Sequence, residues 1–182
     1  RCAVWYAHSH RWIGKSATVE HLGRSVPAKI DPEGFIETDF GTVSFDPALV
    51  PHTLHEMFLS TYPVGGKEVE LSVATSGSAH GIIFCDELPA DREFLELSPT
   101  IENGAEFPER ISVMWAQVVG NDHLKLRIWE RGAGETLGCG TGSVAAAITY
   151  LRREGRGGKV RVSNPGGDVV VCADHWNQPV KV

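Results

Sequence analysis

Residues 130–153 read ERGAGETLGCGTGSVAAAITYLRR, a glycine-rich loop that runs into an alanine-rich segment. The segment at 142–153 predicts a helix that ends before Gly155, with Arg152 and Arg153 in its last turn, where positive charge is favourable. The first two turns of this helix are apolar on every side, so we expect other elements to enclose it.

Short runs typical of β-strands flank this helix in the sequence, and turn signals such as SNPGGD at 163–168 separate them. The runs are VELSVAT at 69–75, GIIFCDEL at 81–88, ISVMWAQVV at 111–119, HLKLRIWE at 123–130, KVRVS at 159–163 and GDVVVCA at 167–173. In 123–130, Leu124, Leu126 and Ile128 alternate with polar or amphipathic residues, which indicates one face in the core. A second helix is expected at residues 1–11. The chain is therefore predicted to be dominated by strands, with two helices.

Composition excludes several functional classes. The net charge of -6 argues against a nucleic-acid partner. The longest apolar stretch, SVAAAITYL at 143–151, is far shorter than the ~20 residues of a membrane span. The start of the chain lacks the layout of a signal peptide, so we predict a cytoplasmic protein without membrane partners. The four cysteines lie far apart, which predicts neither a zinc site nor a disulfide framework.

An internal repeat relates the two ends of the chain. A shift of 143 positions superimposes the second helix and the residues after it on the start of the chain without a gap. The identical pairs are Gly157 with Gly14, Val162 with Val19, Gly166 with Gly23, Val169 with Val26 and Asp174 with Asp31. Three of these pairs mark a helix exit, a turn and a strand interior at matching points. The same shift carries Cys139 to a position five residues before Arg1.

The loop before the enclosed helix has three explanations. A dinucleotide-binding loop needs a third glycine that is missing after Gly132, and a Walker loop needs a lysine that is absent. The third explanation is an anion site, because the free N–H groups at a helix start hold a carboxylate and glycines such as Gly140 and Gly142 allow its close approach. The same dipole is expected to favour the thiolate of Cys139, which could then attack an electrophile or move a proton beside the bound carboxylate.

The ERGAGETLGCGTG block at 130–142 resembles the second signature of the diaminopimelate epimerase family nearly residue for residue. The resemblance extends over most of the chain. TVEHLGRSVPAKIDPEGFIETDFG from Thr18 is similar to the family's mid-chain strands, GSAH at 77–80 lies where the family has G-N-P-H, and FPERISV at 107–113 lies where it has F-P-x-R-x-N-V. The opening RC resembles the end of the first signature, C-G-N-G-x-R-C.

The resemblance implies an α+β fold of two pseudo-symmetric halves, each a curved and mostly antiparallel β-sheet around a central α-helix. Residues 1–39 would be the tail of the N-terminal epimerase half and 40–182 the C-terminal half, so the first half is expected to be only partly present. In this alignment the first cysteine of the family falls five residues before Arg1, where the repeat also puts it. We therefore expect an N-terminally truncated chain.

The resemblance also implies roles for site residues. The catalytic candidates are Cys139, Glu130 and His80. The substrate-binding candidates are Arg131, Gly140, Thr141, Ser78 and Ser112. Cys139 would be one of two cysteines that face the α-carbon from opposite sides, one as thiolate and one as thiol. His80 and Glu130 would surround the amino group, Gly140 and Thr141 would bind the reacting carboxylate, and Arg131 would pair with the distal carboxylate.

The implied function is that of a cofactor-independent isomerase, which converts LL- to meso-diaminopimelate for lysine and peptidoglycan precursors. No metal and no pyridoxal phosphate are expected, the partner is a small amino acid, and a homodimer is compatible with this interpretation. Ser78 and Ser112 stand where the family has asparagine, and a serine offers fewer donors than an amide. Two alternatives therefore stay open: a racemase of another amino acid, such as histidine, on the same fold, and a non-catalytic carboxylate-binding module.

Overall fold

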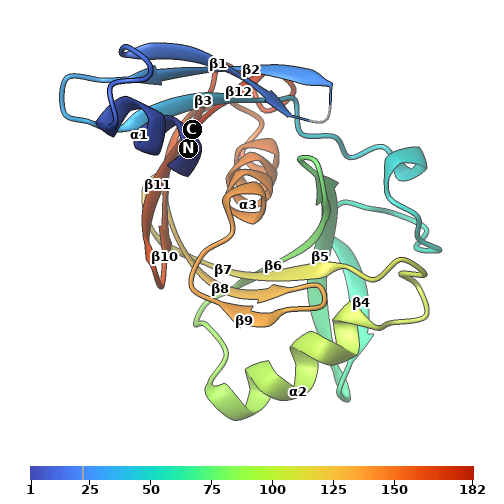
Figure 1. Ribbon diagram of the computed structural model, residues 1–182. Coiled ribbons are helices and arrows are strands. Elements are labelled where there is room, and N and C mark those ends of the chain that lie inside the picture. The colour runs from blue at the N-terminus through green and yellow to red at the C-terminus, as the bar shows by residue number, and fades with distance from the viewer. Residues whose placement is uncertain (22) are drawn as a thin grey trace.

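The computed structural model describes residues 1–21 and 23–182. Within these residues a curved sheet of 12 strands surrounds a central helix (Figure 1). The helices are α1 (Cys2–Ser9), α2 (Asp91–Glu102) and α3 (Gly140–Arg153), with a short 3₁₀ helix, η1, at Pro47–Leu49. The strands are β1 (Ser16–His21), β2 (Arg24–Ile30), β3 (Ile36–Gly41), β4 (Ser60–Val64), β5 (Lys67–Thr75), β6 (Ala79–Cys85), β7 (Ser112–Gly120), β8 (His123–Glu130), β9 (Gly134–Thr136), β10 (Gly158–Asn164), β11 (Gly167–Ala173) and β12 (Val180–Lys181).

The sheet is continuous and mostly antiparallel, as predicted. Its order is β1-β2-β3-β12-β11-β10-β8-β7-β6-β5-β4, and β9 pairs with β8. Among the described strands, the parallel neighbours are β6 with β7 and β8 with β10. Because β6 and β7 are parallel, their first residues lie side by side at the same end of the two strands. β8 runs antiparallel to β7, so its last residues lie at that same end.

α3 is enclosed by the sheet, which confirms the prediction from its apolar surface. Every residue from Gly142 to Leu151 is buried, including the three consecutive alanines Ala145, Ala146 and Ala147. Small side chains let neighbouring strands approach the helix axis closely, and this apolar burial is the main stabilising contribution. In the described residues, no helix combines the length and the apolar character needed to cross a bilayer.

The strand predictions hold best where alternation is strict. β8 has the predicted bounds, and Leu124, Leu126 and Ile128 are the residues that it buries. α2 is a helix that the sequence analysis did not predict. It lies on the outer side of the sheet in Figure 1 and packs Phe94, Leu97 and Ile101 against a second apolar cluster.

The internal repeat is present in the strand register. In the first hairpin Val19 of β1 pairs with Val26 of β2, and in the second Val162 of β10 pairs with Val169 of β11. Both pairs are related by the shift of 143 positions. Because side chains alternate between the two faces of a strand, an identical register places equivalent residues of the two hairpins on equivalent faces. The weak sequence identities therefore mark a real structural duplication.

The third strands of the two copies join the sheet. β3 pairs with β12, and the hydrogen bonds from Thr38 N to Val182 O and from Val182 N to Thr38 O measure 2.7 and 3.0 Å. This junction makes one continuous sheet out of the two repeat copies. The predicted division at residue 39 falls within β3 and remains a prediction.

Gly157 and Gly14 are equivalent in the repeat but have different surroundings. A Cβ on Gly157 would lie 2.0 Å from the carbonyl oxygen of Asp174, whereas a Cβ on Gly14 would meet nothing within 4 Å. We predict that Gly157→Ala lowers the free energy of unfolding by about 3 kcal/mol, because two backbone segments must separate. Gly14→Ala should change it by less than about 0.5 kcal/mol. Chemical denaturation followed by circular dichroism measures both, and equal effects would contradict this assignment.

Candidate functional site

The site is built on the first turn of α3. Cys139 is the N-cap residue, and its Sγ accepts a hydrogen bond of 3.4 Å from Gly142 N. Its carbonyl oxygen accepts two bonds of 2.8 Å from Ser143, one from N and one from Oγ. A Cβ on Gly142 would lie 2.5 Å from Met114 Sδ and 3.2 Å from Cys139 Sγ. Glycine at this position therefore leaves room for Met114 and for the sulfur that folds back over the helix start.

Four of the predicted site residues form one polar cluster. Cys139 Sγ lies 3.8 Å from His80 Nε2 and 3.4 Å from Thr141 Oγ1. Thr141 Oγ1 lies 3.3 Å from His80 Nε2 and accepts a hydrogen bond of 3.4 Å from Ser78 Oγ. The segment before β6 thus meets the start of α3, although the two are about sixty residues apart in the sequence. The structure brings together four residues that the resemblance had assigned to one site.

His80 is fully buried, and burial decides its charge. Burial lowers the pKa of the imidazole to about 4; the backbone of Ser78 opposes this shift, and the positive charge of Arg131 adds to it. Nδ1 is buried and makes no hydrogen bond of suitable geometry within the described chain. His80 is therefore neutral at physiological pH and holds one unused polar atom. Such an atom is costly unless a ligand or water satisfies it.

The thiol of Cys139 behaves differently from the prediction. The helix start was expected to favour the thiolate, but burial raises the pKa of Cys139 above its ordinary value. Hydrogen bonds from Thr141 and Gly142 lower the pKa, and the negative charge of Glu130 raises it further. Desolvation of the sulfur outweighs the helix dipole and its donors. In this structure Cys139 is a neutral thiol.

Glu130 and Ser112 lie at the adjacent ends of β8 and β7. Glu130 ends β8, and its Oε1 accepts a hydrogen bond of 2.7 Å from Thr136 Oγ1 in β9. Ser112 begins β7 directly beside His80 in the parallel register. Its Oγ accepts a hydrogen bond of 3.0 Å from Arg131 N. Ser112 thus supports the backbone of the turn that carries Arg131.

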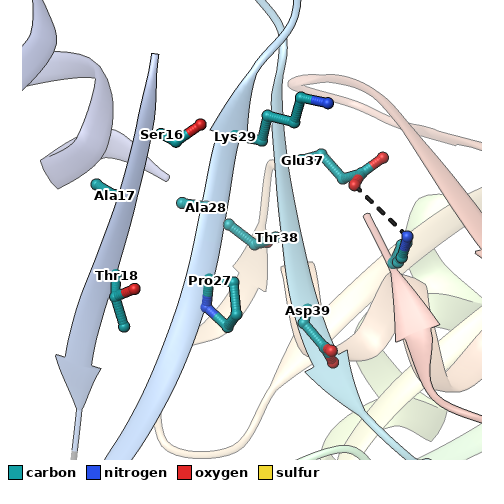
Figure 2. Close-up of a pocket in the computed structure, with 10 residues that line it drawn as sticks. Ser16, Ala17, Thr18, Pro27, Ala28, Lys29, Glu37, Thr38 and Asp39 are labelled. Atoms are coloured by element: carbon teal, nitrogen blue, oxygen red, sulfur yellow. Dashed lines mark ion pairs between the residues drawn. The ribbon is translucent and has the colours of Figure 1, made fainter. Parts of the chain in front are cut away.

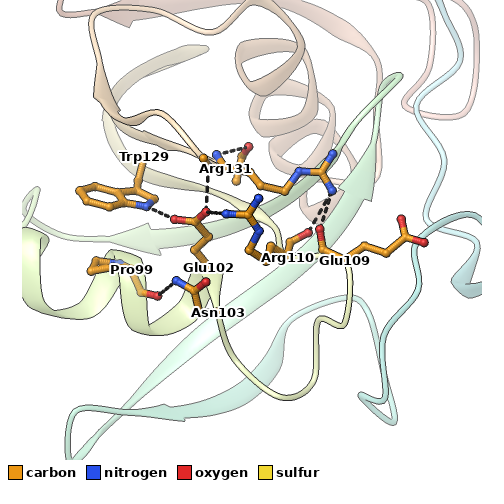
Figure 3. Close-up of polar contacts among 9 residues, drawn as sticks. Pro99, Glu102, Asn103, Glu109, Arg110, Trp129 and Arg131 are labelled. Atoms are coloured by element: carbon orange, nitrogen blue, oxygen red, sulfur yellow. Dashed lines mark hydrogen bonds and ion pairs between the residues drawn. The ribbon is translucent and has the colours of Figure 1, made fainter.

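The guanidinium of Arg131 is exposed and held by main-chain carbonyls. Its Nη1 donates to Glu109 O at 2.7 Å and to Arg110 O at 3.3 Å (Figure 3). Guanidinium has five N–H donors, so this anchoring leaves donors for an anion. Arg131 differs in this respect from the buried cluster around Cys139. It is a fixed positive charge at the open edge of the site.

A pocket of about 620 Å³ lies beside the helix start. Its lining includes Ser76, Gly77, Ser78 and Thr141 together with Phe40, one basic side chain, Arg1, and one acidic side chain, Asp39. Within the described chain, the N–H groups of Gly140 and Thr141 donate to no other residue. A Cβ on Gly140 would approach Arg1 Nη2 to 3.6 Å. Free donors and positive charge at a helix start suit a carboxylate.

A separate pocket of about 550 Å³ lies on the sheet formed by β1, β2, β3 and β12. The residues labelled there in Figure 2 include Ser16, Thr18, Pro27, Lys29, Glu37 and Asp39. Glu37 pairs with Lys181 at 3.8 Å. Of the described residues that line this pocket, none belongs to the predicted site, and no thiol or imidazole is among them.

Several residues that shape the site were not predicted as site residues. Ser76 Oγ donates to Thr141 O at 2.8 Å, and Thr136 holds Glu130. Phe40 packs against the cluster that contains Cys139. Such serine, threonine and phenylalanine residues are common, and their roles depend on contacts between distant segments. Within the described residues, no group of three or more His, Cys, Asp or Glu side chains is arranged to hold a metal ion.

Comparison with known proteins gives a consistent family match. A family model described as diaminopimelate epimerase matches residues 72–182. A diaminopimelate epimerase of Nitrosospira multiformis is 35% identical over 183 residues, which cover 99% of this chain and 65% of that protein. One of Stutzerimonas stutzeri is 36% identical over 92% of this chain and 61% of its own length. The chain spans somewhat less than two thirds of the length of these curated relatives.

Solved structures share the fold at low sequence identity. A hydroxyproline epimerase from Agrobacterium vitis, solved with bound trans-4-hydroxy-L-proline, has a TM-score of 0.66 at 13% identity. The match covers 99% of this chain and 61% of that chain. A PhzF-family phenazine biosynthesis protein from Bacillus anthracis has a TM-score of 0.63 at 14% identity, with 98% and 68% covered. These similarities confirm the predicted fold class.

The burial of His80 predicts a pH dependence of stability. Its folded pKa of about 4 lies below the ordinary value of 6.5, so the unfolded chain binds more protons between these values. Stability contributed by neutral His80 is complete above about pH 6.5 and is lost as pH falls toward 4. Between pH 7 and pH 4 the wild type should lose about 3 kcal/mol more than His80→Gln. Urea denaturation at both pH values tests this, and parallel losses in the two proteins would contradict it.

Proposed function

The chain belongs to the diaminopimelate epimerase family, and on this premise we propose that it serves an isomerase that inverts the α-carbon of an amino acid. The proposed substrate is diaminopimelate, converted from the LL to the meso form. The single observation that carries the proposal is a buried Cys139 thiol at the N-cap of α3, beside free helix N–H groups and a neutral His80. The chemistry requires no pyridoxal phosphate.

The helix start supplies the binding energy for the reacting carboxylate. The N–H groups of Gly140 and Thr141 would donate to its oxygens, and the helix dipole adds favourable charge. When the α-proton leaves, negative charge spreads onto these oxygens. Donors already aimed at them stabilise this charge without reorganisation, which is the most effective form of electrostatic catalysis.

Proton transfer needs an acid and a base on opposite faces of the α-carbon. The other cysteine of the family pair, on the face of the α-carbon opposite Cys139, would remove the α-proton as a thiolate and become a thiol. Cys139 would donate its proton to the other face and become a thiolate. The two sulfurs exchange roles in the reverse reaction, so atoms and charge balance. The raised pKa of Cys139 supports its assignment as the initial acid.

His80 and Glu130 are proposed to surround the reacting amino group. Neutral His80 accepts a hydrogen bond without adding a second positive charge near the ammonium group. Glu130 contributes the opposite charge, and Thr136 fixes one of its oxygens. An ammonium group held by these two residues would also favour loss of the neighbouring proton, because positive charge stabilises the developing carbanion.

A second substrate remains a candidate because of Ser78 and Ser112. Ser112 Oγ accepts a hydrogen bond from Arg131 N and keeps one hydroxyl donor, whereas Ser78 Oγ donates its proton to Thr141 Oγ1. Neither serine offers the spare amide donors of the family's asparagines. A racemase of another amino acid, such as histidine, on the same fold is the alternative that this observation favours.

Exchange of the α-hydrogen with solvent distinguishes an enzyme from a carboxylate-binding module. The complete product of the gene, incubated in deuterated water without pyridoxal phosphate, should incorporate one deuterium at the α-carbon of diaminopimelate. Cys139→Ser should reduce the rate at least about 100-fold, because a hydroxyl is a much weaker acid than a thiol. Mass spectrometry of the amino acid measures the label.

Cys85→Ser is the matched control, since the sulfur of Cys85 contacts Ala116 O on the same strand pair, away from α3. It should keep the wild-type rate. Binding of diaminopimelate and histidine without incorporation of label into either would favour the binding module over the enzyme. Label in histidine alone would favour the second substrate.

Substrate choice can be tested at the two serines. Ser78→Asn and Ser112→Asn together should raise kcat/KM for diaminopimelate relative to histidine by about tenfold or more. The reason is that each new amide donor to a charged carboxylate contributes ~1.5–3 kcal/mol, although neighbouring sites need not add. Steady-state kinetics on both substrates measures the ratio. A lower ratio in the double variant would show that other contacts already hold the distal group.

A further inference from the structure

Glu102 is a buried carboxylate outside the cluster around Cys139. It is the last residue of α2, and its side chain is 6% exposed. Three donors converge on it: Trp129 Nε1 at 2.6 Å, Gly132 N at 2.8 Å and Arg110 Nη1 at 3.2 Å (Figure 3). These donors come from β8, from the turn after β8 and from the segment before β7.

The position of Glu102 is unfavourable for α2 itself. A negative charge at the C-terminal end of a helix opposes the helix dipole, and burial adds a desolvation cost. The three charge-assisted hydrogen bonds compensate this cost, and all of them go to segments outside α2. The buried carboxylate of Glu102 therefore stabilises those segments and not α2.

The segments that donate hydrogen bonds to Glu102 are the ones that position Arg131. Gly132 has a φ of 77°, and Ala133 N donates to Glu130 O at 3.0 Å, so Arg131 occupies the second position of a tight turn. Glu102 binds the next N–H of that turn. It also binds the side chain of Arg110, whose carbonyl oxygen accepts a hydrogen bond from Arg131 Nη1. One carboxylate thus fixes both the backbone that carries Arg131 and the segment that anchors its guanidinium.

We propose that Glu102 is a positioning residue, which sets the direction of the Arg131 guanidinium toward a distal carboxylate of the substrate. The inference rests on the proposed function for the role of Arg131. Glu102 touches no substrate in this mechanism and acts through Gly132 and Arg110. Its loss should weaken recognition of the distal carboxylate and leave the reaction at the α-carbon intact.

Diaminopimelate and lysine form a matched pair of probes, because lysine lacks only the distal carboxylate. In the complete gene product, Glu102→Gln should raise the Kd for diaminopimelate about tenfold by calorimetry, since its amide group cannot accept from all three donors. The Kd for lysine should stay within about twofold. With turnover, KM for diaminopimelate should rise and kcat should stay within about twofold.

Two further variants separate positioning from general stability. Glu106→Gln is the control, because Glu106 accepts from Tyr62 at 3.0 Å in the same loop without contacting the Arg131 turn, and it should leave both Kd values unchanged. In an Arg131→Ala background, Glu102→Gln should add no further loss of diaminopimelate affinity. An additional loss there, or an equal loss for lysine, would overturn the proposal.

The outcomes also separate this inference from the proposed function. Selective loss of diaminopimelate binding in a protein that exchanges no α-hydrogen would support Glu102 and refute the enzyme. Failure of the unsubstituted protein to bind diaminopimelate more tightly than lysine would overturn the role of Glu102. If Glu102→Gln does not fold, Arg110→Ala carries the same test, because that side chain is 52% exposed and its loss removes one of the links.

Discussion

The enclosure of α3 is the constraint on which the remaining structure depends. Ten consecutive residues, Gly142–Leu151, are buried, so strands must pass on every side of the helix. The start of α3 lies near the first residues of β6 and β7 and the last residues of β8. Free helix N–H groups, a thiol, an imidazole and an acidic side chain lie near one another there, because the sheet curves around an apolar helix.

Burial also decides the protonation states of the site. A helix start lowers the pKa of a nearby thiol, but desolvation raises it, and at Cys139 desolvation is the larger effect. The same cause lowers the pKa of His80. Both groups are therefore neutral, one as a thiol and one as a free imidazole. Neither group therefore adds a net charge to the start of α3.

The elements that were predicted from the sequence are those determined by the pattern of residues within a single segment. The apolar surface of α3, the alternation in His123–Glu130 and the repeat shift of 143 all describe a segment by its own residues, and each of these predictions agrees with the structure. α2 was missed because Pro99 interrupts the pattern of an otherwise amphipathic helix. Pro99 is tolerated inside α2, where the burial of Phe94 and Ile101 compensates the lost hydrogen bond.

Contacts between distant segments could not be predicted in this way. The Glu102 network joins residues 30 positions apart, and the sign of the pKa shift at Cys139 depends on how far the fold buries the sulfur. The resemblance carried Cys139, His80 and Arg131 as a set, and the structure places Cys139 Sγ 3.8 Å from His80 Nε2. The roles of these residues remain proposals, since the resemblance does not report burial or hydrogen-bond geometry.

The two repeat copies show how one backbone supports different surroundings. Val19 with Val26 and Val162 with Val169 keep the same hairpin register, yet in α1 only Val4 is buried, whereas α3 buries ten consecutive residues. Gly14 and Gly157 likewise share a position in the repeat, but only Gly157 lies against another backbone segment. Duplication therefore fixes the path of the chain, and the packing partners of each copy determine which of its residues can be changed.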